Sequence, residues 1–568
     1  MGLSRGLFMI NIMPASTAVA IVVCTALAAC GGDESSPVET CSSLLNLTVP
    51  ASAIGLPTRG ARITDAKTVV ASGSGADAIP EYCEVSANIA PVSPSAPPIS
   101  FKLELPRMWN RKIMMLGGGG YDGSISLSLQ AGLSKRPSPL ERGYAVFASD
   151  SGHVGTSKDG SFGLNDEALR NFAGDALKKT RDAAVYLIDR HYAVSRPEKA
   201  YFVGGSSGGR EALEVAQRWP EDWSGIIALY PAWNAASLNL QLGRITRAFA
   251  KPGAYLNSMK RKALLDAAMA ACDGLDGIED GIISNVPACN AVFDPAVAML
   301  NGKPLRCAGG ADTGGTCLSD AQIAALKVYS TPINFNFSLS SGETQYPGFN
   351  VYGANLGIPG NSVVLPSITD TIASLALGNA QPASPMPSNA PYLSVFWDQW
   401  IQYFVTRKPG YNSLSVDPEN PGVWQSRISE LSMLQDQNKV DLSSFAVKGG
   451  KILMAHGTAD VLVSTRSTEQ YYERVQRAMG VARVHDFLRY YEIPGYGHGY
   501  ATVFNAEWDA VTTLENWVEK GIDPSSQVVA DTVGVRGRTR PLCEYPTWPK
   551  YVGSGDVNAA SSFICVDR

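Results

Sequence analysis

The chain has 568 residues, of which 47 are Lys or Arg and 52 are Asp or Glu, so its formal net charge is −5. This near-neutral balance, without any block of like charge, excludes a nucleic-acid-binding surface of the usual basic kind. An apolar fraction of 45% with 17% charged residues is typical of a packed globular protein rather than a disordered one. No apolar run beyond the N-terminus is long enough to cross a bilayer.

Residues 1–29 have the features of an export signal. Arg5 provides a short positive start, an apolar stretch follows, and the segment ends in the string LAAC, whose cysteine is Cys30. Small residues before a cysteine resemble a bacterial lipobox, in which Cys30 carries the lipid; an ordinary signal peptide cut nearby is the alternative. Residues 30–40 are typical of a flexible tether. We therefore expect an outer-membrane lipoprotein or a periplasmic or extracellular protein, with a membrane contact only through this anchor.

Eight cysteines remain once Cys24 and Cys30 are set aside. An even number in an exported chain predicts disulfides, with free buried thiols as the alternative. The absence of any Cys-x-x-Cys pair argues against a zinc ribbon. Proximity in the sequence favours the pairs Cys272–Cys289, Cys307–Cys317 and Cys543–Cys565, which leaves Cys41–Cys83.

Short β-rich runs alternate with helical patterns, which predicts an α/β fold with a mainly parallel sheet. The pattern breaks after residue 230, where the chain becomes rich in Gly, Pro, Ser and Asn, and it resumes at residue 451. We interpret residues 231–450 as a lid domain inserted between two strands of a core domain that comprises residues 41–230 and 451–568. The expected strands are Ile99–Leu105, Lys112–Leu116, Tyr144–Ser149, Ala200–Gly204, Gly225–Tyr230, Lys451–His456 and Phe487–Ile493.

The string GGSSGGR at residues 204–210 lies between an expected strand and a helical run. Ser206 is flanked by Gly204 and Gly208, which satisfies the G-x-S-x-G pattern of a nucleophile elbow. Such a turn lifts the Ser206 hydroxyl above the sheet and leaves the Ser207 N–H at a helix N-terminus, where it can stabilise an oxyanion. A Gly/Ser-rich loop without catalytic role is the alternative, but the strand–turn–helix context favours a nucleophile.

A nucleophilic serine needs a base, and the base needs an acid that orients it. His498 lies in the glycine-rich string PGYGHG after an expected strand, so it is the predicted base. Asp460 follows the strand Lys451–His456 and is the predicted acid; capping of the helix that begins near Thr465 is the alternative. We expect His456 to be a packed residue at the strand end, with an active-site contact as the alternative.

A second oxyanion donor is expected from an early loop. The glycine run at residues 117–120 follows the strand Lys112–Leu116. Glycines let backbone N–H groups approach a ligand, and a phosphate loop would need a following Lys and Ser/Thr that are absent. Gly120 and Ser207 are therefore the predicted oxyanion donors.

With these features the chain resembles the tannase/feruloyl esterase family. The resemblance implies an α/β-hydrolase domain with a large lid, no organic cofactor, and the triad Ser206, Asp460 and His498. Many members carry a cysteine pair beneath the site, where this chain has Gly205 and Gly499, so that covalent tie is missing. The shared strings are YFVGGSSGGR, RWPEDWSGIIALYPAWN, CDGLDGIEDGIISNVPAC, HGTADVLV, YYERV, PGYGH and RTRPLCEYPTWPKYVGSGDVNAASSFIC.

The string CDGLDGIEDGI at residues 272–282 concentrates carboxylates and glycines between two cysteines. Hard oxygen ligands in a tight loop suit calcium, although Ile278 at a would-be ligand position rules out the EF-hand pattern. An acidic surface loop is the alternative. We expect a structural ion because the loop lies far from the triad in sequence. By resemblance, the ligands are the side chains of Asp273, Asp276 and Asp280 and the carbonyls of Ile278 and Ile282.

The leading hypothesis is an exported serine esterase that acts on small aromatic esters of the feruloyl or galloyl type. The alternatives are a half-ester hydrolase of the mono(2-hydroxyethyl) terephthalate type and an inactive surface-binding protein. A half-ester carboxylate calls for an arginine, but none occurs between Arg306 and Arg407. The sequence therefore predicts a preference for neutral aromatic esters. An apolar acyl wall or lid-core packing is expected of Trp397, Trp400, Tyr403 and Phe404.

Overall fold

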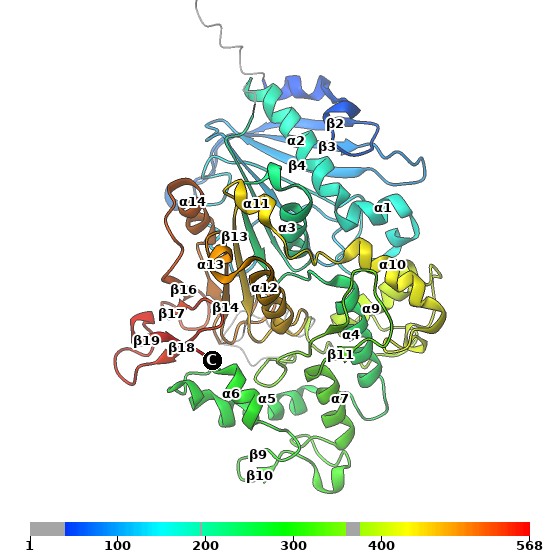
Figure 1. Ribbon diagram of the computed structural model, residues 1–568, viewed down its shortest axis with the longest axis vertical. Coiled ribbons are helices and arrows are strands. Elements are labelled where there is room, and N and C mark those ends of the chain that lie inside the picture. The colour runs from blue at the N-terminus through cyan, green and yellow to red at the C-terminus, as the bar shows by residue number, and fades with distance from the viewer. Residues whose placement is uncertain (1–39, 194–195, 359–374, 502) are drawn as a thin grey trace, which may run out of the picture. The chain divides into compact units, whose positions relative to one another are not determined.

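A ten-stranded mixed sheet forms the centre of the fold (Figure 1). The computed structural model describes residues 40–193, 196–358, 375–501 and 503–568, so Cys30 and most of the expected tether lie outside it. The strand order is β1-β2-β3-β4-β6-β5-β7-β8-β13-β14. The strands are β1 (Thr48–Val49), β2 (Ala61–Val69), β3 (Tyr82–Ile89), β4 (Ile99–Pro106), β5 (Lys112–Leu116), β6 (Ala145–Ser149), β7 (Lys199–Gly205), β8 (Gly225–Leu229), β13 (Lys451–Gly457) and β14 (Leu488–Ile493).

All seven expected strands are present, and their ends agree with the expected ones to within one residue. The prediction of a mainly parallel sheet is right for only part of it. Strands β6, β5, β7, β8, β13 and β14 are parallel, whereas β1 to β4 extend the sheet as antiparallel strands up to β6. Most of β2 is exposed and a bulge between Ile63 and Asp65 breaks its alternation, so its sequence lacks the apolar pattern of a buried strand.

Helices cover both faces of the sheet. On one face α2 (Ala176–Tyr192), α3 (Ser207–Arg218) and α12 (Thr465–Met479) pack with alternate strand residues into one apolar core. On the other face α14 (Ala510–Lys520) packs on the intervening residues. Because both faces are buried, the parallel strands are almost continuously apolar.

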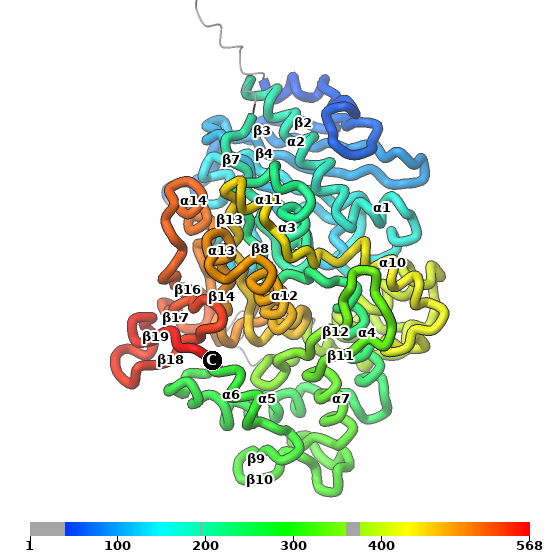
Figure 2. The backbone as a smooth tube through the Cα atoms, viewed as in Figure 1, coloured from blue at the N-terminus to red at the C-terminus, as the bar shows by residue number. Residues whose placement is uncertain are grey.

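The segment between β8 and β13 forms helices and short hairpins around an apolar core (green to yellow in Figures 1 and 2). It leaves the sheet after β8 and returns in the adjacent strand, with Gly225 paired to Lys451. Its elements are α4 (Ala235–Phe249), α5 (Ser258–Cys272), α6 (Val286–Val292), β9 (Met299–Leu300), β10 (Lys303–Pro304), α7 (Asp320–Ser330), β11 (Ile333–Asn334), β12 (Gln345–Tyr346), α9 (Tyr392–Gln399), α10 (Gln425–Gln435) and α11 (Ser443–Val447).

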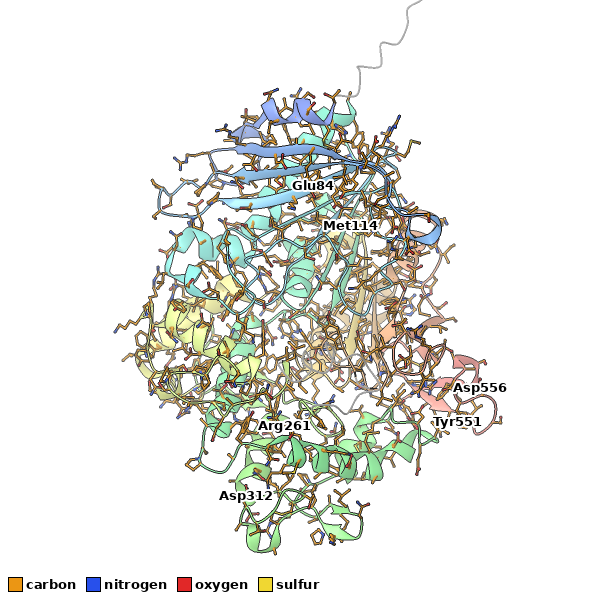
Figure 3. The ribbon with its side chains drawn as sticks, turned by 180° about the vertical axis from the view of Figure 1, so that it is seen from behind. Glu84, Met114, Arg261, Asp312, Tyr551 and Asp556 are labelled. Carbon is orange, nitrogen blue, oxygen red and sulfur yellow. A yellow bond between two sulfur atoms is a disulfide. The ribbon has the colours of Figure 1, made fainter. Side chains whose placement is uncertain are left out.

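The remaining elements are peripheral. They are α1 (Asp166–Arg170), α13 (Val481–His485), β15 (Ala506–Glu507), β16 (Gln527–Asp531), β17 (Thr539–Leu542), β18 (Trp548–Tyr551) and β19 (Phe563–Val566). Viewed from behind, Glu84 of β3 and Met114 of β5 mark the antiparallel and parallel parts of one sheet, and Arg261 marks α5 (Figure 3). Arg261 is buried and donates hydrogen bonds to the carbonyls of Gly357 and Gly378, which ties α5 to two distant parts of the segment between β8 and β13.

Four disulfides join the expected cysteine pairs, namely Cys41–Cys83, Cys272–Cys289, Cys307–Cys317 and Cys543–Cys565. The first ties the start of the described chain to β3, and the last ties the C-terminal hairpin β18–β19 to the end of β17. Within the described ranges, none of the helices combines the length and the apolar character needed to span a membrane.

Candidate active site

Ser206 occupies the turn between β7 and α3 in a strained backbone conformation. Its φ of 62° and ψ of −121° are unusual for any residue other than glycine. Two neighbours hold it there: the Ser206 N–H donates to the Leu229 carbonyl at 3.0 Å, and the Ser206 carbonyl accepts from the Ala232 N–H at 3.1 Å. This is the arrangement expected of a nucleophile elbow.

The glycines of the motif are required by close contacts between backbones. A Cβ added to Gly204 would lie 2.1 Å from the carbonyl oxygen of Gly208, and one added to Gly208 would lie 2.6 Å from that of Gly118. Helix α3 therefore packs directly against both the strand before the turn and the expected oxyanion loop. A side chain at either position would push these three elements apart.

His498 and Asp460 lie in the loops that follow β14 and β13, and their side chains are hydrogen-bonded. His498 Nδ1 donates to Asp460 Oδ2 at 2.7 Å, which leaves Nε2 as the basic nitrogen. The other oxygen of Asp460 accepts from the N–H groups of Leu462 and Val463 at 2.7 and 3.1 Å. Asp460 thus both shapes its own turn and orients the imidazole.

His456 is fully buried and also contacts the acid. Its Nε2 lies 3.1 Å from Asp460 Oδ2, so the expected packed residue makes the active-site contact that was the alternative interpretation. Burial alone would raise the pKa of the Asp460 carboxyl, but the charge of His498 and the hydrogen bonds from both histidines outweigh it and hold this pKa well below its usual range. Asp460 is therefore an anion at any pH near neutrality.

Ser206 and His498 are not hydrogen-bonded to each other within the described residues. Instead, the ring of Tyr230 lies between their loops: it is 4.6 Å from the His498 ring, and a Cβ at Gly205 would lie 2.7 Å from it. A Cβ at Gly499 would lie 3.3 Å from the Tyr230 hydroxyl. Tyr230 therefore fills the space between Gly205 and Gly499, where the resemblance implies a cysteine pair. No sequence pattern indicates this role.

The expected oxyanion donors are tied together. The Ser207 hydroxyl donates to the Gly120 carbonyl at 2.7 Å, and Gly120 has a φ of +62° that favours glycine. The Ser207 N–H lies in the first turn of α3, where N–H groups have no partner within the helix. Gly120, Ser206 and Ser207 also line one pocket, as residues of an oxyanion hole would.

Two buried carboxyl groups support the oxyanion loop from behind. Glu211 of α3 accepts the Gly118 N–H at 3.1 Å, and Asp122 accepts the Ser151 hydroxyl at 2.8 Å. Burial and the charge of Asp122 raise the pKa of Glu211 well above its usual value, and burial raises the pKa of Asp122. Because each buried carboxylate would repel the other, ionisation of both together is disfavoured.

A narrow pocket lies beside Ser206, and its aromatic wall differs from the expected one. Tyr121, Phe172, Tyr392 and Phe396 line it together with aliphatic residues of α4. Trp397, Trp400 and Phe404 are instead fully buried in the apolar core that the segment between β8 and β13 shares with its neighbours, so for them the alternative of core packing is correct. The reason is helical register: positions 392 and 396 share one face of α9, and position 397 lies on another.

Arg407 and Arg210 both have protein partners. Arg407 pairs with Asp166 and the Leu164 carbonyl, so it does not enter the pocket. Arg210 lines the pocket, but it donates to the Phe172 carbonyl at 2.9 Å and lies 3.5 Å from Glu214. Neither offers an unpaired guanidinium to a substrate carboxylate.

The carboxylates of the expected calcium loop accept hydrogen bonds from the loop's own backbone. Asp273 accepts from the Gly281 N–H and Asp276 from the Ser284 N–H, while Asp280 pairs with Arg540. Burial raises the pKa of Asp276 to about 6, and the nearby charge of Asp280 adds to the rise. In the described part of the chain, no three His, Cys, Asp or Glu side chains are placed to hold a metal ion.

The loop is close to the active site in space, although it is distant in sequence. A Cβ at Gly495, three positions before His498, would lie 3.2 Å from Ile282. Asp273 and His498 also line the same cavity. Separation in sequence is therefore not separation in space here, and the structural role of an ion in this loop stays a prediction.

Comparisons with known proteins agree with this geometry. The family model described as tannase and feruloyl esterase matches residues 83–566. An esterase of Agrobacterium fabrum, named as uncharacterised, is 37% identical over 93% of both chains. The mono(2-hydroxyethyl) terephthalate hydrolase of Piscinibacter sakaiensis is 31% identical over 87% of this chain and 86% of its own. The structure of feruloyl esterase B from Aspergillus oryzae aligns with a TM-score of 0.72 at 21% identity, covering 93% of this chain and 99% of that one.

Proposed function

Because the chain belongs to the tannase and feruloyl esterase family of carboxylic ester hydrolases, we propose that it is an exported serine esterase for esters of aromatic acids. The observation that carries the proposal is the strained Ser206 turn beside an apolar pocket lined by aromatic rings. His498, held by the buried anion Asp460, comes from the end of a strand in the same sheet.

In the proposed mechanism Ser206 Oγ attacks the ester carbonyl while His498 Nε2 takes its proton. The N–H groups of Gly120 and Ser207 stabilise the oxyanion. The tetrahedral intermediate collapses, and His498 returns the proton to the leaving alcohol. Water, deprotonated by His498, then attacks the acyl-enzyme and releases the acid and Ser206. The Ser206–His498 hydrogen bond forms in the substrate complex, where catalytic hydrogen bonds tighten.

A neutral acyl group is proposed over an anionic one. The pocket beside Ser206 presents apolar and aromatic side chains, and its arginine, Arg210, is committed to Glu214 and to a carbonyl. A terephthalate half-ester would bring a second carboxylate to this wall without a bidentate partner. Similarity to the terephthalate half-ester hydrolase keeps that activity as the second candidate.

Export is proposed from the lipobox at Cys30 and from the four disulfides. Disulfides persist in oxidising compartments and are rare in the cytosol. A lipid on Cys30 would place the enzyme on a membrane surface, where residues 30–40 act as the spacer.

We also propose a structural calcium ion held by Asp273, Asp276 and Asp280 with the carbonyls of Ile278 and Ile282. Carboxylate and carbonyl oxygens suit a hard cation, but binding would require the three carboxylates to turn toward a common centre, with Asp280 leaving Arg540. Asp273 and Asp276 support the proposal, because within the described residues neither carboxylate has a cationic partner and Asp276 is only 1% exposed. A bound ion would neutralise these buried charges and fix the backbone of Ile282 beneath the His498 loop.

Chelation is expected to lower the melting temperature by several degrees, reversibly on adding calcium, because a ligand at 100-fold its Kd stabilises by about 2.7 kcal/mol. The measurement is thermal unfolding with and without excess chelator. Asp276→Asn should remove the sensitivity, whereas Asp266→Asn, on the exposed pair with Lys262, should keep it. An unchanged melting curve in chelator, with no metal by elemental analysis, would show that the loop holds no ion.

A fluorophosphonate probe tests the esterase assignment itself. We expect one covalent adduct on the peptide that contains Ser206, located by tandem mass spectrometry, because only an activated serine displaces fluoride at a useful rate. Ser207→Ala is the matched control and should still be labelled, since alanine keeps the backbone N–H of residue 207 and leaves the Ser206 hydroxyl in place. A protein that takes up no label, or is labelled at another residue, would contradict the proposal.

A further inference from the structure

Tyr230 has a backbone conformation that an aromatic residue rarely adopts. It directly follows β8, and its φ of 34° lies in the region that favours glycine. Its N–H donates to the Ala455 carbonyl of β13 at 2.7 Å, and the residue is 6% exposed. Such a conformation is costly and persists only where the surrounding structure imposes it. The neighbours of the side chain therefore indicate what the conformation achieves.

The ring of Tyr230 lies between the nucleophile turn and the base loop. On one side, a Cβ added to Gly205, directly before Ser206, would lie 2.7 Å from a ring carbon. On the other side, the ring centroid lies 4.6 Å from that of His498, with the two planes 53° apart. Burial and the negative charge of Asp460 raise the pKa of the Tyr230 hydroxyl. The hydroxyl therefore stays protonated, and the side chain fills space rather than acting as a base.

The hydrogen bonds of the His498 loop do not fix its distance from the nucleophile turn. His498 Nδ1 donates to Asp460, which holds one nitrogen but lets the imidazole swing about that bond. The Gly499 N–H donates to the Gly497 carbonyl at 2.9 Å, and the Gly499 carbonyl accepts the Tyr496 hydroxyl at 2.6 Å. These last two bonds are internal to the loop, so they shape it without reaching the turn.

We propose that Tyr230 is a positioning residue, whose ring is the spacer that sets the distance and angle between the His498 imidazole and the Ser206 turn. Removing the ring would let His498 move into the vacated space, out of line with the Ser206 hydroxyl. Proton transfer depends on this geometry, and a misplacement of about 1 Å can cost roughly 100-fold in rate. The inference rests on the proposed function, since it takes His498 as the base of Ser206.

The same ring accounts for the glycines at positions 205 and 499. A Cβ at Gly205 would lie 2.8 Å from the Tyr230 hydroxyl oxygen, and a Cβ at Gly499 would lie 3.3 Å from it. Since both positions face one oxygen atom, a pair of side chains there and the tyrosine ring exclude each other. Without the ring, the two positions would face each other across a space comparable with the Cβ separation of about 3.5–4.5 Å that a disulfide spans.

Replacements of Tyr230 separate the ring from its hydroxyl. Tyr230→Phe keeps the ring and loses one long hydrogen bond, so kcat for a p-nitrophenyl ester should stay within about threefold of the wild type. Tyr230→Ala should lower kcat about 100-fold with little change in KM, since Tyr230 does not line the pocket beside Ser206. Fluorophosphonate labelling of Ser206 should slow by the same factor, because it also needs His498. Tyr230→Leu, which leaves a smaller cavity, gives the same comparison should the alanine variant not fold.

Tyr144→Ala is the matched control for lost packing. Tyr144 is a fully buried tyrosine of the same apolar core. It precedes β6, so it lies at the opposite end of the parallel strands from the catalytic residues. Its replacement should lower the melting temperature, as Tyr230→Ala does, while kcat per folded molecule stays within about threefold of the wild type.

A cysteine pair should produce a rescue that restored packing alone would not. In the Tyr230→Ala background, Gly205→Cys with Gly499→Cys should form a disulfide, detected by mass spectrometry, and return kcat to within about tenfold of the wild type. Gly205→Ser with Gly499→Ser matches the cysteines in size but cannot bond, so this pair should leave kcat as low as in Tyr230→Ala.

The inference is overturned if Tyr230→Ala loses no more kcat than Tyr144→Ala, if the loss lies in KM, or if Tyr230→Phe is equally impaired. Cysteines that fail to bond, or that bond without raising kcat above that of the serine pair, would overturn it as well. In each of these cases a wild type labelled at Ser206 leaves the esterase in place. A wild type that takes up no label would instead overturn the proposed function, and this inference with it.

Discussion

Replacing Ser206 with alanine is expected to lower kcat for a neutral aryl ester by about 10⁵-fold or more, in line with nucleophile deletions in serine hydrolases. Alanine keeps the Cβ and therefore the strained turn, whose hydrogen bonds to Leu229 and Ala232 use only the backbone. The loss should appear in kcat with little change in melting temperature. The measurement is p-nitrophenyl ester hydrolysis at saturating substrate, with the folded fraction checked by circular dichroism.

The neighbouring hydroxyl provides the control for this change. Ser207→Ala removes only the 2.7 Å bond to the Gly120 carbonyl, which orders the oxyanion loop. We expect a loss of about tenfold, since one neutral hydrogen bond contributes roughly 0.5–1.5 kcal/mol. If Ser207→Ala lowered kcat as much as Ser206→Ala, or if Ser206→Ala retained a tenth of the wild-type kcat, the assignment of Ser206 as the nucleophile would be wrong.

Asp460→Asn is expected to lower kcat by about 10⁴-fold, the effect of the same change in a serine protease triad. The amide cannot accept hydrogen bonds at both oxygen positions, which in the native enzyme receive His498, His456 and two backbone N–H groups. His498 would then adopt the tautomer that blocks Nε2 as a base. The readout is kcat together with its pH profile.

The depressed pKa of Asp460 fixes the sign of the pH dependence. A carboxyl whose folded pKa lies below its unfolded value of 3.8 stabilises the fold above about pH 4, and this contribution is lost only as pH falls further. Protonation of Asp460 should therefore not contribute to any loss of activity above about pH 4. His456→Gln, which keeps a side-chain N–H near Asp460, is the matched control and should retain activity within about tenfold, because His456 contacts the acid and not the reacting atoms. If His456→Gln and Asp460→Asn lowered kcat equally, Asp460 would act mainly through packing.

The core of the fold and the reactive residues were predictable because local patterns encode them. The strand–turn–helix pattern around the glycines identified Ser206. Asp460 and His498 were identified because each follows an apolar strand, and parallel strands bring their carboxyl ends to one edge of a sheet. The antiparallel strands β2 and β3 were missed because their outer faces carry polar residues, as strands near a sheet edge do.

The residues that shape the pocket were not predictable in the same way. Tyr230 follows an apolar strand and resembles any core aromatic; its place between Gly205 and Gly499 depends on three loops meeting. The residues expected in the pocket wall were not those that line it: Phe396 lines the pocket and Trp397 is buried in the core, because tertiary packing sets which helix face meets the pocket.

The pairing of β8 with β13 has a consequence for how the chain folds. Gly225 meets Lys451 in register, so the sheet cannot be completed until the whole lid segment has been made and its ends brought together. Closing a longer loop costs only about 0.6 kcal/mol per doubling of length, but such non-local pairing slows folding. Until then the apolar strand β8 has an open edge that can pair wrongly. The disulfides Cys272–Cys289 and Cys307–Cys317 join cysteines 17 and 10 positions apart within the segment between β8 and β13. They can form before β8 pairs with β13, and they then shorten the loop that this pairing must close.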